Sequence, residues 1–223
     1  MDTIRQMLRD GLKPGVGLDM DNTTASLDSN MVPGLNKMLG TNYTAKDLNS
    51  TWYWMERELH LDRSVFWLLY NDAWMHYKTL KPLITPQELE LVSQHYRVDF
   101  ITAKESHATM PYVFDFISMH FPNHRGAVIE VDLGNRKTDF GHRILVDDAP
   151  HVAEAVQSER SGKYIYLVRG NEDGEYGYNA HIARTHKVRP VPNTHEAMRK
   201  LVMMARSAQE SGRVTVTKAR DIG

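Results

Sequence analysis

The sequence contains no cysteine among its 223 residues. That absence excludes disulfide bridges, zinc–thiolate sites, iron–sulfur clusters and a catalytic thiol. The chain also lacks an excess of positive charge, because 27 Lys and Arg residues face 28 Asp and Glu residues and leave a formal net charge of −1. A protein that coats nucleic acid needs a broad positive field to hold a phosphate polymer, so that class is disfavoured.

Long hydrophobic runs are lacking as well. The longest, residues 65–70, is far shorter than the stretch of about 20 residues that spans a bilayer. Residues 1–14 carry charge throughout and lack the apolar region of a signal peptide. We therefore expect a cytoplasmic protein with no membrane partner. Its oligomeric state stays open, with a homodimer among the alternatives.

Short apolar runs and helix-like segments alternate along the chain. The runs span residues 15–20, 97–102, 127–131, 143–146 and 164–168. Continuous rather than alternating hydrophobicity is typical of strands buried on both faces of a parallel sheet. Strands that alternate with helices indicate βαβ units. We expect an α/β fold, a Rossmann-like parallel sheet of about five strands flanked by helices.

The clearest helix start is at Thr85, where Pro86 and Glu88 complete the pattern of a capping box. Further helix starts are predicted at Pro111, Pro150 and Thr194. The last helix is expected to end near Ser207, and residues 213–223 are interpreted as a C-terminal tail.

Residues 26–81 contain no convincing strand and are interpreted as a small helical cap inserted after the first strand. The α/β core would then comprise residues 1–25 and 82–212. Aromatic residues recur at helical spacing in the second half of the cap, and this pattern favours a role in the cap's own core. They are Phe66, Trp67, Tyr70, Trp74 and Tyr77.

Three consecutive aromatic residues, Trp52, Tyr53 and Trp54, differ from that pattern. They cannot all face one core, so at least one should lie near solvent or a cleft. A flat ring there can stack on a nucleobase. Trp52 and Trp54 are the predicted stacking residues.

Acidic residues end two of the predicted strands. Asp19 and Asp21 end the first, and Asp147 and Asp148 end the fourth. Alternate residues of an extended chain point the same way, so Asp19 and Asp21 are expected to leave their strand together. Each pair has an ordinary alternative, since Asp favours turns and helix N-caps. Because both pairs follow buried strands, they predict a Mg²⁺ site at the edge where open α/β sheets bind ligands.

Two further groups suit a phosphate beside such a metal. Thr102 ends the second predicted strand, where its hydroxyl and the backbone N–H of Ala103 can hold phosphate oxygens. Lys137 precedes the fourth strand and can neutralise both phosphate and carboxylates. The ordinary alternatives are a strand-terminal threonine and a solvated loop. His142, which lies nearby in the sequence, could line the same cleft, although a surface or cap role is favoured.

Taken together, these residues resemble the four motifs of haloacid dehalogenase-like phosphatases. Residues 19–23 resemble the first motif, Asp-x-Asp-x-Thr, although the family usually has Gly where this chain has Asn22. Thr102, Lys137 and the Asp147–Asp148 pair resemble the second, third and fourth motifs, in the same order.

Within that superfamily the chain resembles the 5'(3')-deoxyribonucleotidases. The likeness rests on Arg136–Lys137–Thr138 shortly before residues 145–150, and on a short helical cap between the first and second motifs.

The resemblance implies a chemistry for each residue. Asp19 would be the nucleophile that forms an aspartyl-phosphate, and Asp21 would be the general acid and base. Asp19, the backbone carbonyl of Asp21, and one or both of Asp147 and Asp148 would hold Mg²⁺. The phosphoryl group would bind Thr102, Ala103 and Lys137.

The implied substrate is a nucleoside monophosphate, which makes the protein a 5'-nucleotidase-like phosphatase. Two alternatives remain open. One is a phosphatase for a sugar phosphate or another small phosphoester, and the other is a non-catalytic binding protein with the same fold.

Overall fold

The structure is a computed structural model that describes residues 1–44, 47, 55, 59–104, 107–132, 136–158, 162–171, 174–175 and 182–220. Trp52 and Trp54, the predicted stacking residues, lie outside the described residues. Among the helices that the structure does describe, none combines the length and apolar character that crossing a bilayer requires.

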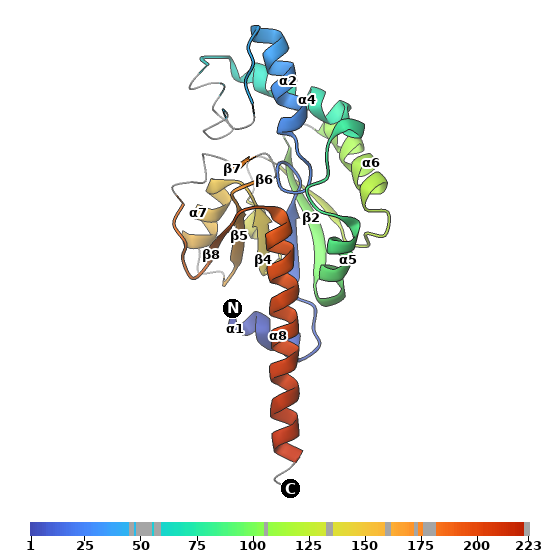
Figure 1. Cartoon of the computed structure of the whole chain (residues 1–223), viewed down its shortest axis with the longest axis vertical. Coiled ribbons are helices and arrows are strands. Elements are labelled where there is room, and N and C mark those ends of the chain that lie inside the picture. The colour runs from blue at the N-terminus through green and yellow to red at the C-terminus, as the bar shows by residue number, and fades with distance from the viewer. Residues whose placement is uncertain are drawn as a thin grey trace.

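Six parallel strands form the central sheet, in the order β3-β2-β1-β4-β5-β8 (Figure 1). They are β1 (Gly15–Asp19), β2 (Arg97–Lys104), β3 (Val128–Asp132), β4 (Ile144–Asp147), β5 (Tyr164–Val168) and β8 (Val188–Val191). A separate antiparallel pair joins β6 (Gly170–Asn171) to β7 (Gly174–Glu175). The strand order confirms the predicted Rossmann-like fold, in which the direction of winding reverses at β1.

The expectation of about five strands misses β8. Its sequence is Val-Arg-Pro-Val, and proline cannot donate a hydrogen bond to a neighbouring strand. Pro190 fits because β8 pairs with β5 alone, at the edge of the sheet. An edge strand tolerates a residue that would argue against a central one.

Helices cover both faces of the sheet. They are α1 (Asp2–Arg9), α5 (Pro86–His95), α6 (Met110–His120), α7 (Pro150–Ser158) and α8 (Thr194–Arg220). Buried residues of α1, α5, α6 and α8 share one apolar cluster with Leu18, Phe100 and Val146 of the sheet. Buried residues of α7 pack in a second cluster with Ile101 and Leu145. The nearly continuous burial of the strands follows from this two-sided cover.

The predicted helix starts agree with the structure, and the capping box at Thr85 is complete, with Glu88 bonded back to the Thr85 backbone. The predicted end of the last helix near Ser207 is wrong, because α8 continues to Arg220 and projects beyond the sheet (Figure 1). Residues 208–220 contain no proline, and a single Gly212 costs only about 1 kcal/mol in a helix.

The stretch that follows β1 contains α2 (Asp28–Leu39), α4 (Arg63–Met75) and the short helix η2 (Tyr77–Thr79). Figure 1 shows α2 and α4 together at one end of the molecule, opposite the end at which α8 finishes. A Cβ atom on Gly34 of α2 would lie 2.9 Å from Leu69 of α4, so this glycine lets the two helices pack closely. Two other short helices, η3 (His107–Thr109) and η4 (Lys137–Asp139), follow β2 and precede β4.

Candidate functional site

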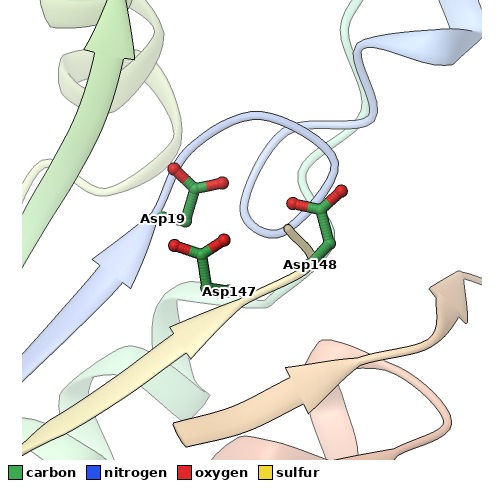
Figure 2. Close-up of side chains that lie close together, drawn as sticks. All are labelled: Asp19, Asp147 and Asp148. Carbon is green, nitrogen blue, oxygen red and sulfur yellow. The ribbon is translucent and has the colours of Figure 1, made fainter. Parts of the chain in front are cut away.

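Three carboxylates meet where the winding of the sheet reverses. Leu18 of β1 pairs with Val146 of β4, so the next residues, Asp19 and Asp147, end neighbouring strands. Asp148 follows Asp147, and the three side chains each offer an oxygen within 4.8 Å of the other two (Figure 2). All three residues are buried. The sequence predicts these residues near one another because the carboxyl ends of parallel strands share an edge.

The crowding of negative charge at the site affects the pKa of the Asp19 carboxyl. Burial raises the pKa of Asp19 well above its usual range, Lys137 opposes this shift, and the charges of Asp147, Asp148 and Asp21 add to it. Without further positive charge at the site, the ionised form of Asp19 is therefore disfavoured.

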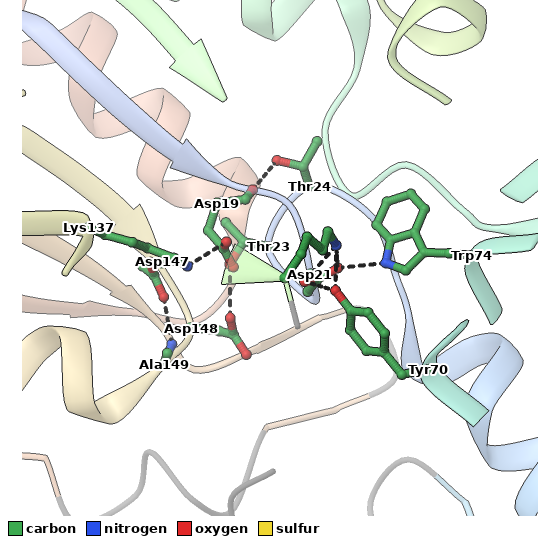
Figure 3. A network of polar contacts seen from close by, with 11 residues as sticks. Asp19, Asp21, Thr23, Thr24, Tyr70, Trp74, Lys137, Asp147, Asp148 and Ala149 are labelled. Carbon is green, nitrogen blue, oxygen red and sulfur yellow. Dashed lines mark hydrogen bonds and ion pairs between the residues drawn. The ribbon is translucent and has the colours of Figure 1, made fainter. Parts of the chain in front are cut away.

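Lys137, in η4, lies between two of these carboxylates. Its Nζ donates to Asp19 Oδ1 at 2.6 Å and to Asp147 Oδ2 at 2.8 Å (Figure 3). Burial alone would lower the pKa of Lys137, but the attraction of Asp147 and Asp19 is stronger and holds that pKa above its usual range. The ammonium ion is thus fixed against the two carboxylates that the sequence predicts it to neutralise.

Asp21 contacts a different set of groups. Its carboxylate accepts hydrogen bonds from Tyr70 Oη at 2.8 Å and Trp74 Nε1 at 3.0 Å, both on α4. Lys104 Nζ, at the end of β2, lies 3.0 and 3.1 Å from the two carboxylate oxygens. β1 ends at Asp19, so Asp21 lies beyond the strand, and the two carboxylates have separate hydrogen-bond partners.

The chain turns sharply after Asp21. Asn22 has a φ of 53°, in the left-handed region that favours glycine and that asparagine tolerates. Asn22 also exchanges hydrogen bonds with Asp28 at the start of α2. The asparagine therefore provides the turn for which the resembled motif uses glycine, and it ties that turn to the next helix.

Of two threonines near these residues in the fold, Thr23 contacts the site and Thr102 follows Ile101, the strand partner of Asp19. Thr23 Oγ1 donates to Asp148 Oδ1 at 3.2 Å, and the backbone oxygen of Thr23 accepts a bond from Thr194, where α8 begins. Thr102 is fully buried, and its hydroxyl has no hydrogen-bond partner in the part of the chain that the structure describes. A buried hydroxyl without a partner costs about 1–3 kcal/mol, so this one suits a ligand oxygen.

Sequence reasoning misses the side chains of Lys104, Tyr70, Trp74 and Thr23. The aromatic residues are predicted as cap core, and the structure does bury Tyr70 and Trp74. The sequence did contain a signal for these contacts, because a buried Tyr or Trp usually finds a hydrogen-bond partner for its hydroxyl or indole N–H. Burial lowers the pKa of Lys104, against the attraction of Asp21, and raises the pKa of Tyr70 well above its usual range.

His142 does not line this edge. It precedes β4, and its Nε2 lies 2.8 Å from Asp99 Oδ2, inside β2. Asp99 also accepts bonds from the backbone of Ala127 and from Arg97. Burial favours the neutral acid, but His142, Ala127 and Arg97 outweigh it and lower the pKa of Asp99. This buried pair ties the strands together away from the carboxylates.

Fold and site together define an open α/β protein with a cluster of buried carboxylates at the reversal point of its sheet, the place where such folds bind ligands. The sequence matches no family model and no curated protein. Among solved structures, CbbY from Rhodobacter sphaeroides in complex with phosphate is similar, with a TM-score of 0.53 and 12% identity over 83% of this chain and 96% of that chain.

Weaker likenesses have TM-scores below 0.5. A haloacid dehalogenase-like family hydrolase from Xanthomonas campestris gives 0.43 at 13% identity, over 87% of this chain and 98% of that one. The putative HAD-hydrolase YfnB from Bacillus subtilis, bound to magnesium, has a TM-score of 0.44 and 11% identity. That match covers 85% of this chain and 98% of that chain. At such an identity the likeness to CbbY concerns the fold alone, an open α/β fold built on a parallel sheet. The likeness of the motifs to those of haloacid dehalogenase-like phosphatases stays a prediction. The narrower likeness to deoxyribonucleotidases stays a prediction.

Proposed function

We propose that the protein is a Mg²⁺-dependent phosphomonoester hydrolase that works through an aspartyl-phosphate on Asp19. The observation that carries the proposal is the buried contact of Asp19 with Lys137, beside Asp147 and Asp148. It joins a nucleophile, a fixed positive charge and a set of oxygen ligands at one point, which is what phosphoryl transfer needs from a protein.

The charges of the site support a divalent cation. Asp19, Asp21, Asp147 and Asp148 carry four negative charges when ionised, Lys104 and Lys137 carry two positive ones, and the sum is −2. Buried charge without compensation is strongly destabilising. A doubly charged ion held by oxygen ligands would balance the site, and Mg²⁺ prefers such ligands.

Asp19, Asp147 and Asp148 are the side chains that would hold the ion, with the Asp21 backbone carbonyl as the ligand that the resembled motif adds. When bound, Mg²⁺ supplies positive charge that offsets the phosphoryl oxygens and the carboxylates. It would also favour the ionised form of Asp19, the form that can attack phosphorus.

The chain's own residues then divide the reaction into two steps. The Asp19 carboxylate attacks phosphorus, the bond from phosphorus to the substrate oxygen breaks, and Asp21 gives that oxygen a proton. Asp21 next takes a proton from water, whose oxygen attacks phosphorus and releases inorganic phosphate and free Asp19. Lys137 and the Thr102 hydroxyl, which has no partner among the described residues, would bind the phosphoryl oxygens, and the backbone of Ala103 is the third proposed contact.

We further propose a nucleoside monophosphate as substrate. The support is the likeness of residues 136–138 and 145–150 to deoxyribonucleotidases, and the aromatic character of the cap. Sugar phosphates and other small phosphoesters are the competing substrates.

The test is phosphate release from matched panels of 5'- and 3'-nucleotides and sugar phosphates, with Mg²⁺ and with a chelator. We expect Mg²⁺-dependent release that favours nucleotides, and its loss in Asp19→Asn with the fold retained. Release that favours sugar phosphates would overturn the substrate class. No release from any phosphoester would favour the non-catalytic binding protein.

A further inference from the structure

The carboxylate of Asp21 is saturated by protein donors. Oδ1 lies 3.0 Å from both Trp74 Nε1 and Lys104 Nζ, and Oδ2 lies 2.8 Å from Tyr70 Oη and 3.1 Å from Lys104 Nζ (Figure 3). A carboxylate offers about four lone-pair positions, so these four contacts use its full capacity. Few arrangements fix the orientation of a carboxylate more completely.

The donors come from two separate parts of the chain. Lys104 belongs to the central sheet, whereas Tyr70 and Trp74 lie one turn apart on α4. Lys104 Nζ also donates to Tyr70 Oη, and it lies 4.3 Å from the centroid of the Trp74 ring. The Trp74 ring in turn packs edge-on against Phe116 of α6, at 5.9 Å. All the contacts of Asp21 can therefore form together only where α4 is seated against the sheet and α6.

The two buried lysines divide the acidic site between them. Lys137 contacts Asp19 and Asp147, and Lys104 contacts Asp21. The Lys104 side chain is fully buried, so its charge is screened little by solvent. Without it, Asp21 would be a buried carboxylate held by uncharged donors alone, close to three further carboxylates.

We propose that Lys104, Tyr70 and Trp74 are positioning residues for Asp21, which make its orientation for proton transfer depend on the seating of α4. This inference rests on the proposed function of Asp21 as general acid and base. Lys104 and Trp74 can only donate, whereas the Tyr70 hydroxyl both donates and accepts. The hydroxyl can therefore turn away from Oδ2, which frees that oxygen to carry the proton and pass it to a substrate oxygen, and it can stay in contact with Lys104.

The dependence of the rate on the leaving group distinguishes a loss of Asp21 positioning from a general structural defect, which would slow both substrates alike. When the bond from phosphorus to an alkyl oxygen breaks, a strongly basic alkoxide leaves and needs the proton of Asp21. A p-nitrophenolate leaves without one. Loss of Asp21 positioning should slow the first step, phosphoryl transfer to Asp19, for an alkyl phosphate and spare it for p-nitrophenyl phosphate. The second step, in which Asp21 activates water, should slow equally for both substrates.

The experiment compares kcat/KM for glycerol 2-phosphate and p-nitrophenyl phosphate in wild type, Lys104→Met, Tyr70→Phe and Asp21→Asn. This ratio reports the steps up to departure of the leaving group and leaves out the later attack of water. We expect kcat/KM for the alkyl phosphate to fall about 10²-fold in Lys104→Met, as for loss of a general acid. It should fall about tenfold in Tyr70→Phe, as for loss of a hydrogen bond to a charged group. For the aryl phosphate, kcat/KM should change less than threefold in both variants, because its leaving group needs no proton.

Tyr77→Phe is the matched control, since Tyr77 lies in η2, outside this network, and should leave both rates unchanged. Tyr70→Phe keeps the packing of the ring and removes only the hydroxyl. This variant therefore still tests the positioning of Asp21 if Lys104→Met fails to fold. Suppose first that Asp21→Asn affects the two substrates differently. Equal losses on both substrates in Lys104→Met and Tyr70→Phe, or no loss on either, would then overturn the inference. If Asp21→Asn does not separate them, the proposed acid role itself fails.

Discussion

Replacement of Lys137 by methionine tests how strongly the site depends on positive charge. The Lys137 Nζ lies 2.6 Å from Asp19 and 2.8 Å from Asp147, and the side chain is only 6% exposed. Removing one partner of a buried ion pair costs about 3–5 kcal/mol. We expect Lys137→Met to lose about that much free energy of unfolding when a chelator is present.

Added Mg²⁺ should then restore part of this loss. The charge sum of the site changes from −2 to −3 when Lys137 is removed. A cation that binds only the folded protein stabilises it by RT ln(1 + [L]/Kd), so tighter binding gives a larger gain. Mg²⁺ should therefore raise the urea midpoint of Lys137→Met more than that of wild type.

The assay is urea unfolding of both proteins with a chelator and with Mg²⁺ at a series of concentrations. Lys78→Met, which removes an exposed lysine, is the matched control and should behave as wild type. An unfolding midpoint of Lys137→Met that does not respond to Mg²⁺, or responds less than that of wild type, would refute the charge argument.

Three further outcomes are expected. Asp99→Asn should cost about 1–3 kcal/mol of unfolding free energy at neutral pH, because it breaks the charged contact with His142. The folded-state pKa of Asp99 lies below its ordinary value of 3.8, so this stabilisation is present above that pH and disappears as the pH falls through the lowered pKa. A wild-type-to-variant difference that persists in acid would contradict the assignment. Thr85→Ala should cost about 1 kcal/mol through loss of the capping box, measured by thermal or urea unfolding. Thr102→Val should leave stability unchanged or raised, since the hydroxyl has no partner among the described residues, and should raise KM for phosphoesters. An unchanged KM would show that the Thr102 hydroxyl does not bind substrate.

Much of the fold could be predicted because local patterns and burial agree. The strand ending at Asp19 and the strand ending at Asp147 are apolar and continuous, and both lie inside the sheet as predicted. The helix at Thr85 begins where its cap residues indicate. Parallel strands share an edge, so sequence alone could place the acidic residues near one another.

The remaining features depend on contacts between distant segments. Lys104 meets Tyr70 across 34 positions and Asp21 across 83 positions, and no local pattern encodes such a meeting. The aromatic spacing indicated a buried helix face, and the same residues also present a hydroxyl and an indole N–H to Asp21. Pro190 made residues 188–191 look unlike a strand, because proline cannot donate a hydrogen bond to a neighbouring strand. At the edge of a sheet proline is acceptable, and β8 pairs there with β5.

The central claim is that Asp19 carries the phosphoryl group during turnover. The most direct measurement is mass spectrometry of the acid-quenched protein, taken during hydrolysis of a phosphomonoester with Mg²⁺ present. The account predicts a phosphoryl adduct on the peptide that contains Asp19, lost when Mg²⁺ is chelated and absent from Asp19→Asn. Steady turnover with no adduct on that peptide, and with Asp19→Asn still active, would contradict it.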